Sequence, residues 1–273
     1  MGSRSPSFVL AVGALAVGAL LSPLEGHARA FECLRTEEGA DLHWGARDIS
    51  WWLDAELERR FGRDVLEGPF RVWSRRECTD LRFSLDGVRE GLTAGFDGVV
   101  EPVVVWRSVW PHGSGVWALT TTAYDPSTGV ILDADIELDG ASGALGTVEA
   151  PLTCAQVPVL DVTALLTHEV GHFVGLAHVF DAPAAVMAPG ARVCEVQKRE
   201  LSDDDVRGVC ALYPSGVEGS GCEDDGGCRC ARRPGGFGGW LSAALMFLCW
   251  RWTRSRSSCL ASTARGDFGP SAS

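Results

Sequence analysis

Residues 165–178 read Leu-Leu-Thr-His-Glu-Val-Gly-His-Phe-Val-Gly-Leu-Ala-His, and this stretch constrains the fold more than any other part of the chain. Residues four apart on an α-helix share a face, so His168 and His172 point the same way. Gly175 can adopt the positive φ that ends a helix, and the turn would bring His178 back beside the other two imidazoles. The stretch therefore predicts a helix, a turn and three converging histidines.

Three imidazoles at one point suit a zinc ion and leave its fourth tetrahedral position to water, as in catalytic sites. Glu169 follows the first histidine, so it can reach that water without being a ligand. A His-Glu-x-x-His pair also occurs on ordinary polar helices, but three of the six histidines of this chain fall at the required positions. We therefore predict one zinc ion held by His168, His172 and His178, with Glu169 as the catalytic residue.

The extended pattern His-x-x-x-His-x-x-Gly-x-x-His resembles the metzincin metalloproteases. In that family a methionine-containing turn passes beneath the metal. The sequence Ala-Val-Met-Ala-Pro places Met187 nine residues after His178, which resembles the matrixin branch in spacing. Matrixins usually have an aromatic residue where this chain has Ala188 and a serine where it has Val179. The resemblance implies a zinc endopeptidase with a protein or peptide substrate; the alternative is an inactive, zinc-stabilised binding module.

The order of the expected elements is typical of an α+β fold. Segments rich in β-branched and aromatic residues, typical of strands, precede and follow segments whose apolar residues are spaced as on a helix. Gly68 and Pro69 predict a bend in the second helical stretch, and Ser202 is the expected N-cap of the last helix. In a matrixin this order forms a twisted mixed sheet with a backing helix, the metal helix, and a small C-terminal subdomain with the Met turn and a closing helix. The expected strands are 48–54, 79–85, 99–110, 117–124 and 130–138, and the expected helices are 55–63, 65–76 and 201–213.

An acidic stretch precedes the metal helix. Carboxylates gathered in one place suit a hard cation, so these side chains either bind calcium or form a solvated acidic face of a strand. The four residues are Asp133, Asp135, Glu137 and Asp139. Many matrixins bind a second, structural zinc in this region, for which the chain offers only His112.

The chain divides into four segments. Residues 1–30 read as a secretory signal peptide, because Arg4 precedes an apolar run that ends in the small-x-small pattern Ala-Arg-Ala. Residues 31–214 form the metallopeptidase domain, with the resemblance covering about 41–214. Residues 215–227 are an acidic Gly/Ser linker, and residues 228–273 form a C-terminal tail.

The tail carries Gly-Cys-Arg-Cys, then an apolar stretch at 235–250, then arginines. This order resembles the C-terminal sorting tails of the MYXO-CTERM type, which are processed near the cysteines after export. The apolar stretch is shorter than the roughly 20 residues of a spanning helix, although a transmembrane anchor is the simpler interpretation. We expect transient membrane contact and a mature protein that ends close to Cys228 or Cys230, secreted or at the cell surface.

The net charge indicates which partners the domain can bind, and the cysteine content indicates the compartment in which it folds. The chain has a net charge of −12, and residues 31–227 contain 34 acidic and 15 basic residues, so the domain would repel nucleic acid. We expect a monomer. The 10 cysteines of an exported chain predict disulfides. The two pairings we favour are Cys194 with Cys210 and Cys33 with Cys78, among fifteen ways of pairing six cysteines.

Overall fold

A computed structural model describes residues 31–216, apart from 75, 97, 150–153 and 155–157, and the backbone of residues 260–265. The predicted signal peptide and the apolar stretch of the tail lie outside this part of the chain. Within it, no helix has the length and apolar character that a membrane crossing requires.

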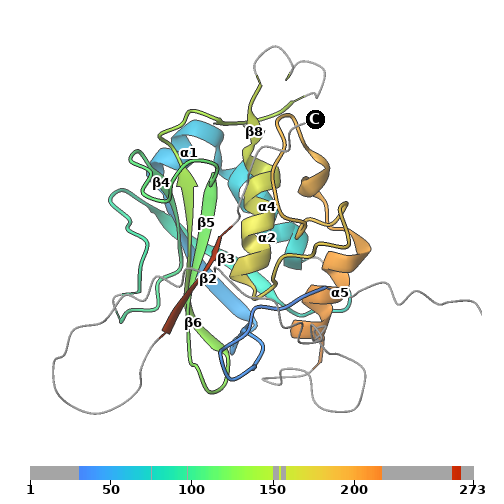
Figure 1. The fold of residues 1–273 in the computed structure, drawn as a ribbon. Coiled ribbons are helices and arrows are strands. Elements are labelled where there is room, and N and C mark those ends of the chain that lie inside the picture. The colour runs from blue at the N-terminus through green and yellow to red at the C-terminus, as the bar shows by residue number, and fades with distance from the viewer. Residues whose placement is uncertain are drawn as a thin grey trace, which may run out of the picture.

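A twisted sheet of seven strands forms one layer of the molecule, and helices form the other (Figure 1). The strand order is β3-β2-β4-β6-β5-β9, and short β1 pairs with β6 outside this path. All pairs are parallel except β5 with β6 and β5 with β9. The strands are β1 His43–Trp44, β2 Asp48–Asp54, β3 Arg82–Arg89, β4 Val103–Arg107, β5 Ala118–Tyr124, β6 Val130–Asp139 and β9 Leu260–Arg265; a separate pair is β7 Leu145–Gly146 with β8 Leu160–Asp161.

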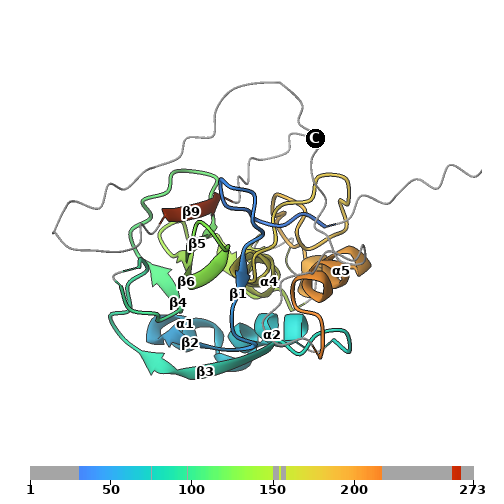
Figure 2. The same cartoon turned by 90° about the horizontal axis from the view of Figure 1, so that it is seen from below.

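The helices α2 and α4 pack against each other on one face of the sheet, as the view from below shows (Figure 2). Helix α2 buries Leu66, Phe70 and Trp73, whose spacing of four and three residues makes one apolar stripe. Phe70 stacks on Trp51 of β2 with ring centroids 4.1 Å apart. The helices are α1 Ala55–Phe61, α2 Arg63–Ser74, α4 Val162–Phe173 and α5 Asp203–Leu212, with a short 3-10 helix η1 at Gln197–Arg199.

The mixed α+β architecture is as predicted, and the two expected helical stretches are α1 and α2. Helix α2 continues through Gly68 and Pro69, where a bend was predicted. The chain breaks at Gly62, where φ is 80° after the end of α1. Pro69 lies inside α2 with its ring buried in the core. Because Gly62 takes a conformation that other residues rarely adopt, it ends the helix more effectively than the Gly-Pro pair. Strand β3 also starts three residues later than predicted, and β4 is shorter.

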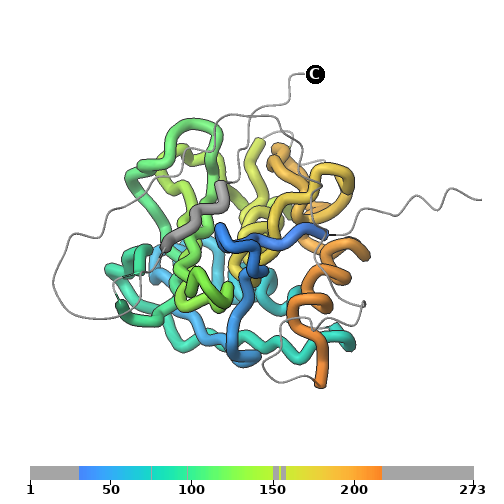
Figure 3. Tube along the Cα trace, turned by 60° about the horizontal axis from the view of Figure 1, so that its bottom comes forward, coloured from blue at the N-terminus to red at the C-terminus, as the bar shows by residue number. Residues whose placement is uncertain are grey.

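Two segments from the ends of the chain join this core. The N-terminal segment runs beside α4, where Leu34 donates its N–H to the Gly175 carbonyl and Ala177 donates to Glu32; Figure 3 shows it in blue. From the tail, β9 pairs with the outer edge of β5 along its whole length. No strand was expected in the tail.

Both favoured disulfide pairings are wrong. Cys78 bonds Cys210, and Cys154 bonds Cys194, with Cα atoms 5.4 Å and 5.6 Å apart. The first bond ties the end of α2 to α5, beside the bridge between Thr79 and Pro214. Cys33 is also held in a disulfide, so the predicted Cys33–Cys78 pair cannot form. These pairs join segments that meet only in the folded chain, which sequence spacing does not reveal.

Candidate metal centre

Helix α4 carries the centre of the site and is capped by its own sequence. The Asp161 carboxylate accepts the Ala164 N–H at 2.8 Å, as an N-cap does. Nearly every residue of α4 is buried, because the helix packs against α2, β5 and β6. At its far end, Trp44 and Tyr213 donate to the carbonyls of Phe173 and Val174, which have no partner within the helix.

Gly175 turns the chain after α4, as predicted. Its φ is 98°, and a Cβ at this position would lie 2.1 Å from the Leu42 carbonyl oxygen. Any other residue would therefore clash with the N-terminal segment as well as strain the backbone. The turn brings His178 back against the helix.

The three predicted histidines lie together. The Nε2 atom of His178 is 3.1 Å from Nε2 of His168 and 3.2 Å from Nε2 of His172. The ligand atoms of the three side chains all lie within 4.8 Å of one another. No other group of three or more His, Cys, Asp or Glu side chains comes together in this way in the part of the chain that the structure describes. His168 and His172 are buried, whereas His178 is half-buried.

The hydrogen bonds of the imidazoles fit a zinc ion. His168 Nδ1 lies 2.6 Å from the Val186 carbonyl oxygen, and His172 Nδ1 lies 2.8 Å from that of Leu176. A carbonyl can only accept, so both Nδ1 atoms donate and both Nε2 atoms carry a lone pair. Lone pairs gathered about 3 Å from the third imidazole suit a cation between them, and an outer carbonyl partner is usual for a metal-binding imidazole.

Burial keeps these imidazoles neutral, which a metal ligand must be. It lowers the pKa of His172 to about 3, helped by the neighbouring His178. Burial also lowers the pKa of His168 well below its usual value, with His172 and His178 adding to the effect.

Met187 lies directly beneath α4. A Cβ on Gly171 would be 2.1 Å from the Met187 sulfur, so the glycine between the two helix histidines provides the space for the Met turn. The turn is held from α5, because Asp205 accepts the N–H groups of Val186 and Met187 at 2.8 Å and 3.1 Å. Since the Val186 carbonyl orients His168, Asp205 supports the imidazole of His168 through the turn.

Glu169 is fully buried between α4 and β5. Its Oε2 accepts a hydrogen bond of 2.6 Å from the Thr120 hydroxyl, which also lies 3.1 Å from the Glu169 carbonyl oxygen. Its Oε1 is buried and has no hydrogen-bond partner among the described residues. Burial raises the pKa of Glu169 to about 7, while the hydrogen bond from Thr120 opposes this shift.

Comparisons with known proteins agree with this geometry. Residues 112–214 match the family model of the matrixins. The chain is 31% identical over 194 residues to "Metalloendoproteinase 5-MMP" of Arabidopsis thaliana, covering 68% of this chain and 46% of the relative. It is 27% identical over 158 residues to "Macrophage metalloelastase" of Oryctolagus cuniculus, covering 58% of this chain and 30% of the relative. The chain thus spans less than half the length of these curated relatives.

The comparisons support a matrixin-like metalloprotease. The matched segment begins at His112 and contains β5, β6, α4, the Met turn and α5. The histidines, Glu169, Thr120, the Met turn and Asp205 therefore lie within the matched region, whereas Leu42 and Trp44 come from the N-terminal segment before it.

The structure contradicts one of the two interpretations of the acidic strand, that of a solvated face. Its four carboxylates are buried, so they do not form a solvated face. They alternate along β6 and point to one side, where consecutive members are about 7 Å apart and do not converge on one point. Asp135 accepts the N–H groups of Gly95 and Val103, and Glu137 lies 2.6 Å from His112. Calcium binding stays a prediction.

Sequence reasoning missed three residues of the site: Thr120, Asp205 and Lys198. Thr120 is the first of three consecutive threonines, and nothing in the sequence distinguishes it from the other two as a partner of Glu169. Asp205 forms a capping box with Ser202, the expected N-cap, and this local role is all that its position in the sequence indicates. Its bonds to the Met turn join residues 18 and 19 positions apart, which no local pattern encodes.

Proposed function

We propose that the chain is a zinc-dependent endopeptidase that hydrolyses peptide bonds with an activated water. The observation that carries this proposal is the pairing of three convergent imidazoles with a buried carboxylate whose second oxygen is unengaged. The residues that would hold zinc are His168, His172 and His178. When bound there, zinc would act as a Lewis acid toward the scissile carbonyl and lower the pKa of water.

Glu169 is the residue we assign to proton transfer. Thr120 holds Oε2, so Oε1 is the oxygen available to a water molecule at the centre. A pKa of about 7 suits both directions of transfer at neutral pH. Glu169 therefore accepts a proton from the attacking water and returns it to the leaving amine.

The alternative of an inactive binding module is not favoured by the comparisons, whose relatives carry the names of proteinases. The site itself argues the same way. A buried carboxylate with an unengaged oxygen is unfavourable for stability, so a centre kept for structure alone has no use for it.

We further propose that the protein acts outside the cytoplasm. The disulfides Cys78–Cys210 and Cys154–Cys194 favour an oxidising compartment, in line with the signal sequence expected at residues 1–30. Processing of the tail near Cys228 or Cys230 is part of the same proposal and lies outside the described residues.

Digestion of casein by the full chain tests the proposal. We expect digestion by the zinc-loaded protein, loss of it after treatment with 1,10-phenanthroline, and recovery when zinc is added back. Calcium added in place of zinc should not restore activity. Zinc-loaded, folded protein that leaves casein and a mixed peptide library intact would refute the endopeptidase.

A further inference from the structure

Lys198 of η1 places a buried ammonium group beside the candidate centre. The side chain is 6% exposed, and its Nζ donates to the carbonyl oxygens of Ala188 and Gly190 at 2.5 Å and 2.7 Å. An ammonium group has three N–H donors, so one remains after these two bonds.

No carboxylate pairs with this charge among the described residues, where no Asp or Glu oxygen lies within 4.0 Å of Nζ. The acidic side chains around it are engaged elsewhere. Asp205 accepts backbone N–H groups of the Met turn, and Asp161 pairs with Arg199. Glu195 accepts the N–H of Arg192 at the exposed edge. Buried charges are normally paired, and burial lowers the pKa of Lys198.

Lys198 lines a cleft and also a small cavity that His168 borders. The cleft has a volume of about 980 Å³, and its lining includes Val116, Trp117 and Leu160 as well as Lys198. The small cavity is lined by Lys198 together with His168, so the ammonium lies between the cleft and the metal centre. A side chain of a peptide bound at the centre can therefore enter the cleft and approach Nζ.

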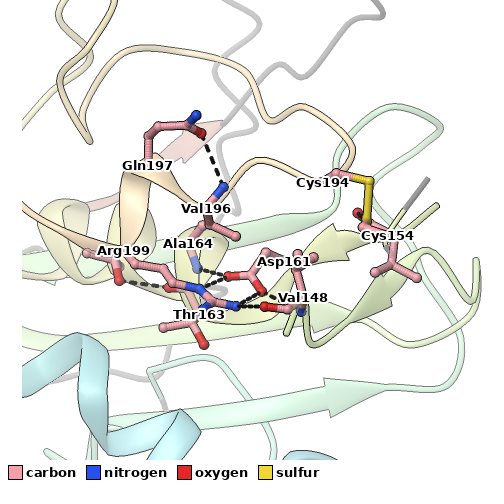
Figure 4. A network of polar contacts seen from close by, with 11 residues as sticks. Val148, Cys154, Asp161, Thr163, Ala164, Cys194, Val196, Gln197 and Arg199 are labelled. Carbon is pink, nitrogen blue, oxygen red and sulfur yellow. Dashed lines mark hydrogen bonds and ion pairs between the residues drawn. A yellow bond between two sulfur atoms is a disulfide. The ribbon is translucent and has the colours of Figure 1, made fainter. Parts of the chain in front are cut away.

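The wall that carries Lys198 is fixed on both sides. The disulfide Cys154–Cys194 holds the loop before η1, and Arg199 donates to Asp161 at the start of α4 (Figure 4). Arg199 also donates to the Val148 carbonyl. These bonds restrain the backbone on both sides of Lys198, and its own bonds to the carbonyls of Ala188 and Gly190 hold the ammonium in place.

We infer that Lys198 makes this cleft a pocket for a carboxylate, so that the enzyme prefers peptides with an acidic side chain next to the scissile bond. The inference rests on the proposed function and deepens it by naming a substrate class. An aspartate or glutamate of the substrate would give the ammonium the direct carboxylate partner that none of the described residues supplies, in a cleft whose lining also includes Arg192 and Glu195. A charged hydrogen bond of this kind is stronger than a neutral one.

Matched peptides test the pocket. Once a cleaved sequence is found in a peptide library, two peptides are made that differ only by Glu or Gln beside the scissile bond. We expect kcat/KM for the Glu peptide to exceed that for the Gln peptide by about tenfold or more, as removal of a charged hydrogen bond implies. Lys198→Met should bring the ratio close to one, whereas Lys198→Arg, which keeps the charge, should retain part of it. Equal rates for the two peptides in the parent protein would overturn the inference.

A binding measurement separates the pocket from the activity. Fluorescence anisotropy with zinc-loaded Glu169→Gln, which retains Lys198, should show tighter binding of the Glu peptide than of the Gln peptide. Equal affinities would refute the pocket. If no library peptide is cleaved, a Glu/Gln pair of one library sequence is used for binding alone. A clear preference for its Glu form then leaves the pocket standing while the proposed function fails. If Lys198→Met does not fold, the ratio of kcat/KM for the Glu and Gln peptides in the parent protein still tests whether the pocket prefers a carboxylate.

Discussion

Two regions of this molecule gather buried side chains of the kinds that bind metals. Around α4, the Nδ1 atoms of His168 and His172 donate outward to carbonyls, and the Nε2 atoms face one another. Along β6, Asp135 and Asp139 accept backbone N–H groups of the adjacent loops, and Glu137 pairs with His112. The histidine cluster offers lone pairs that a cation could bind, whereas these carboxylates already have donors from their own chain. The direction of the lone pairs, more than the residue types, distinguishes the two.

The largest effect expected is on the activity of the histidine cluster. Glu169→Gln removes the proton acceptor and leaves all three imidazoles, so turnover should fall by about 10²- to 10⁴-fold. Zinc content, measured by atomic emission, should stay at the parent value. Near-normal turnover of the variant would show that another group transfers the proton.

His178→Ala should weaken zinc binding itself, because it removes one of three ligands. We expect a loss of affinity greater than the roughly 10- to 100-fold typical of an outer-sphere change. The matched control is His112→Ala, which removes an imidazole from the acidic region and should leave zinc affinity unchanged. Equal zinc affinity of His178→Ala and the parent would place the third ligand elsewhere.

The pH dependence of stability should separate Glu169 from the carboxylates of β6. In the metal-free protein its pKa is raised to about 7, so the stability it contributes is fully present below about pH 4.5 and is lost as pH rises through 7. Relative to Glu169→Gln, the parent should lose about 3 kcal/mol of unfolding free energy between pH 4.5 and 8. Urea denaturation of both proteins at these pH values measures the difference. A difference that does not change with pH would contradict the raised pKa.

Asp135→Asn should affect stability but not zinc. The change leaves a buried N–H without its acceptor, so the unfolding free energy should fall by about 1–3 kcal/mol in urea denaturation. Asp86→Asn, at an exposed position of β3, should change it by less than about 0.5 kcal/mol.

The effect of calcium on the Tm of the parent and of Asp135→Asn tests whether the acidic strand binds this ion. If millimolar calcium raises the Tm of the parent and not that of Asp135→Asn, the acidic strand binds calcium. If neither protein shifts, the prediction of calcium binding is wrong and the carboxylate of Asp135 serves the N–H groups of Gly95 and Val103 alone.

The smallest effect should come from the hydroxyl that orients Glu169. Thr120→Val keeps the shape of the side chain and removes its hydrogen bond, so kcat should fall by about tenfold with little change in KM. Thr120→Ser restores the hydroxyl and should recover most of the loss. If valine and serine behave alike, packing at this position matters and the hydrogen bond does not.

Much of the site was predictable because its information is local. The spacing of His168, His172 and Gly175 depends only on helix periodicity and on a backbone conformation that glycine favours. The strand at 48–54 and the cap at Ser202 depend likewise on alternation and on a neighbouring side chain. Such patterns have the same meaning in any fold, so the chain alone determined the α+β class and the position of the metal helix.

Only the tertiary structure decided which distant groups meet. The pairing of Cys78 with Cys210 spans 132 residues, and the contact of Thr120 with Glu169 spans 49. The burial of the carboxylates on β6 and the isolation of the Lys198 charge likewise depend on loops from other parts of the chain. Hydrogen bonds, disulfides and charge pairs act over a few ångströms in space, and sequence spacing records that distance only within one helix, strand or turn. Beyond that range, the packing of the elements determines the contacts.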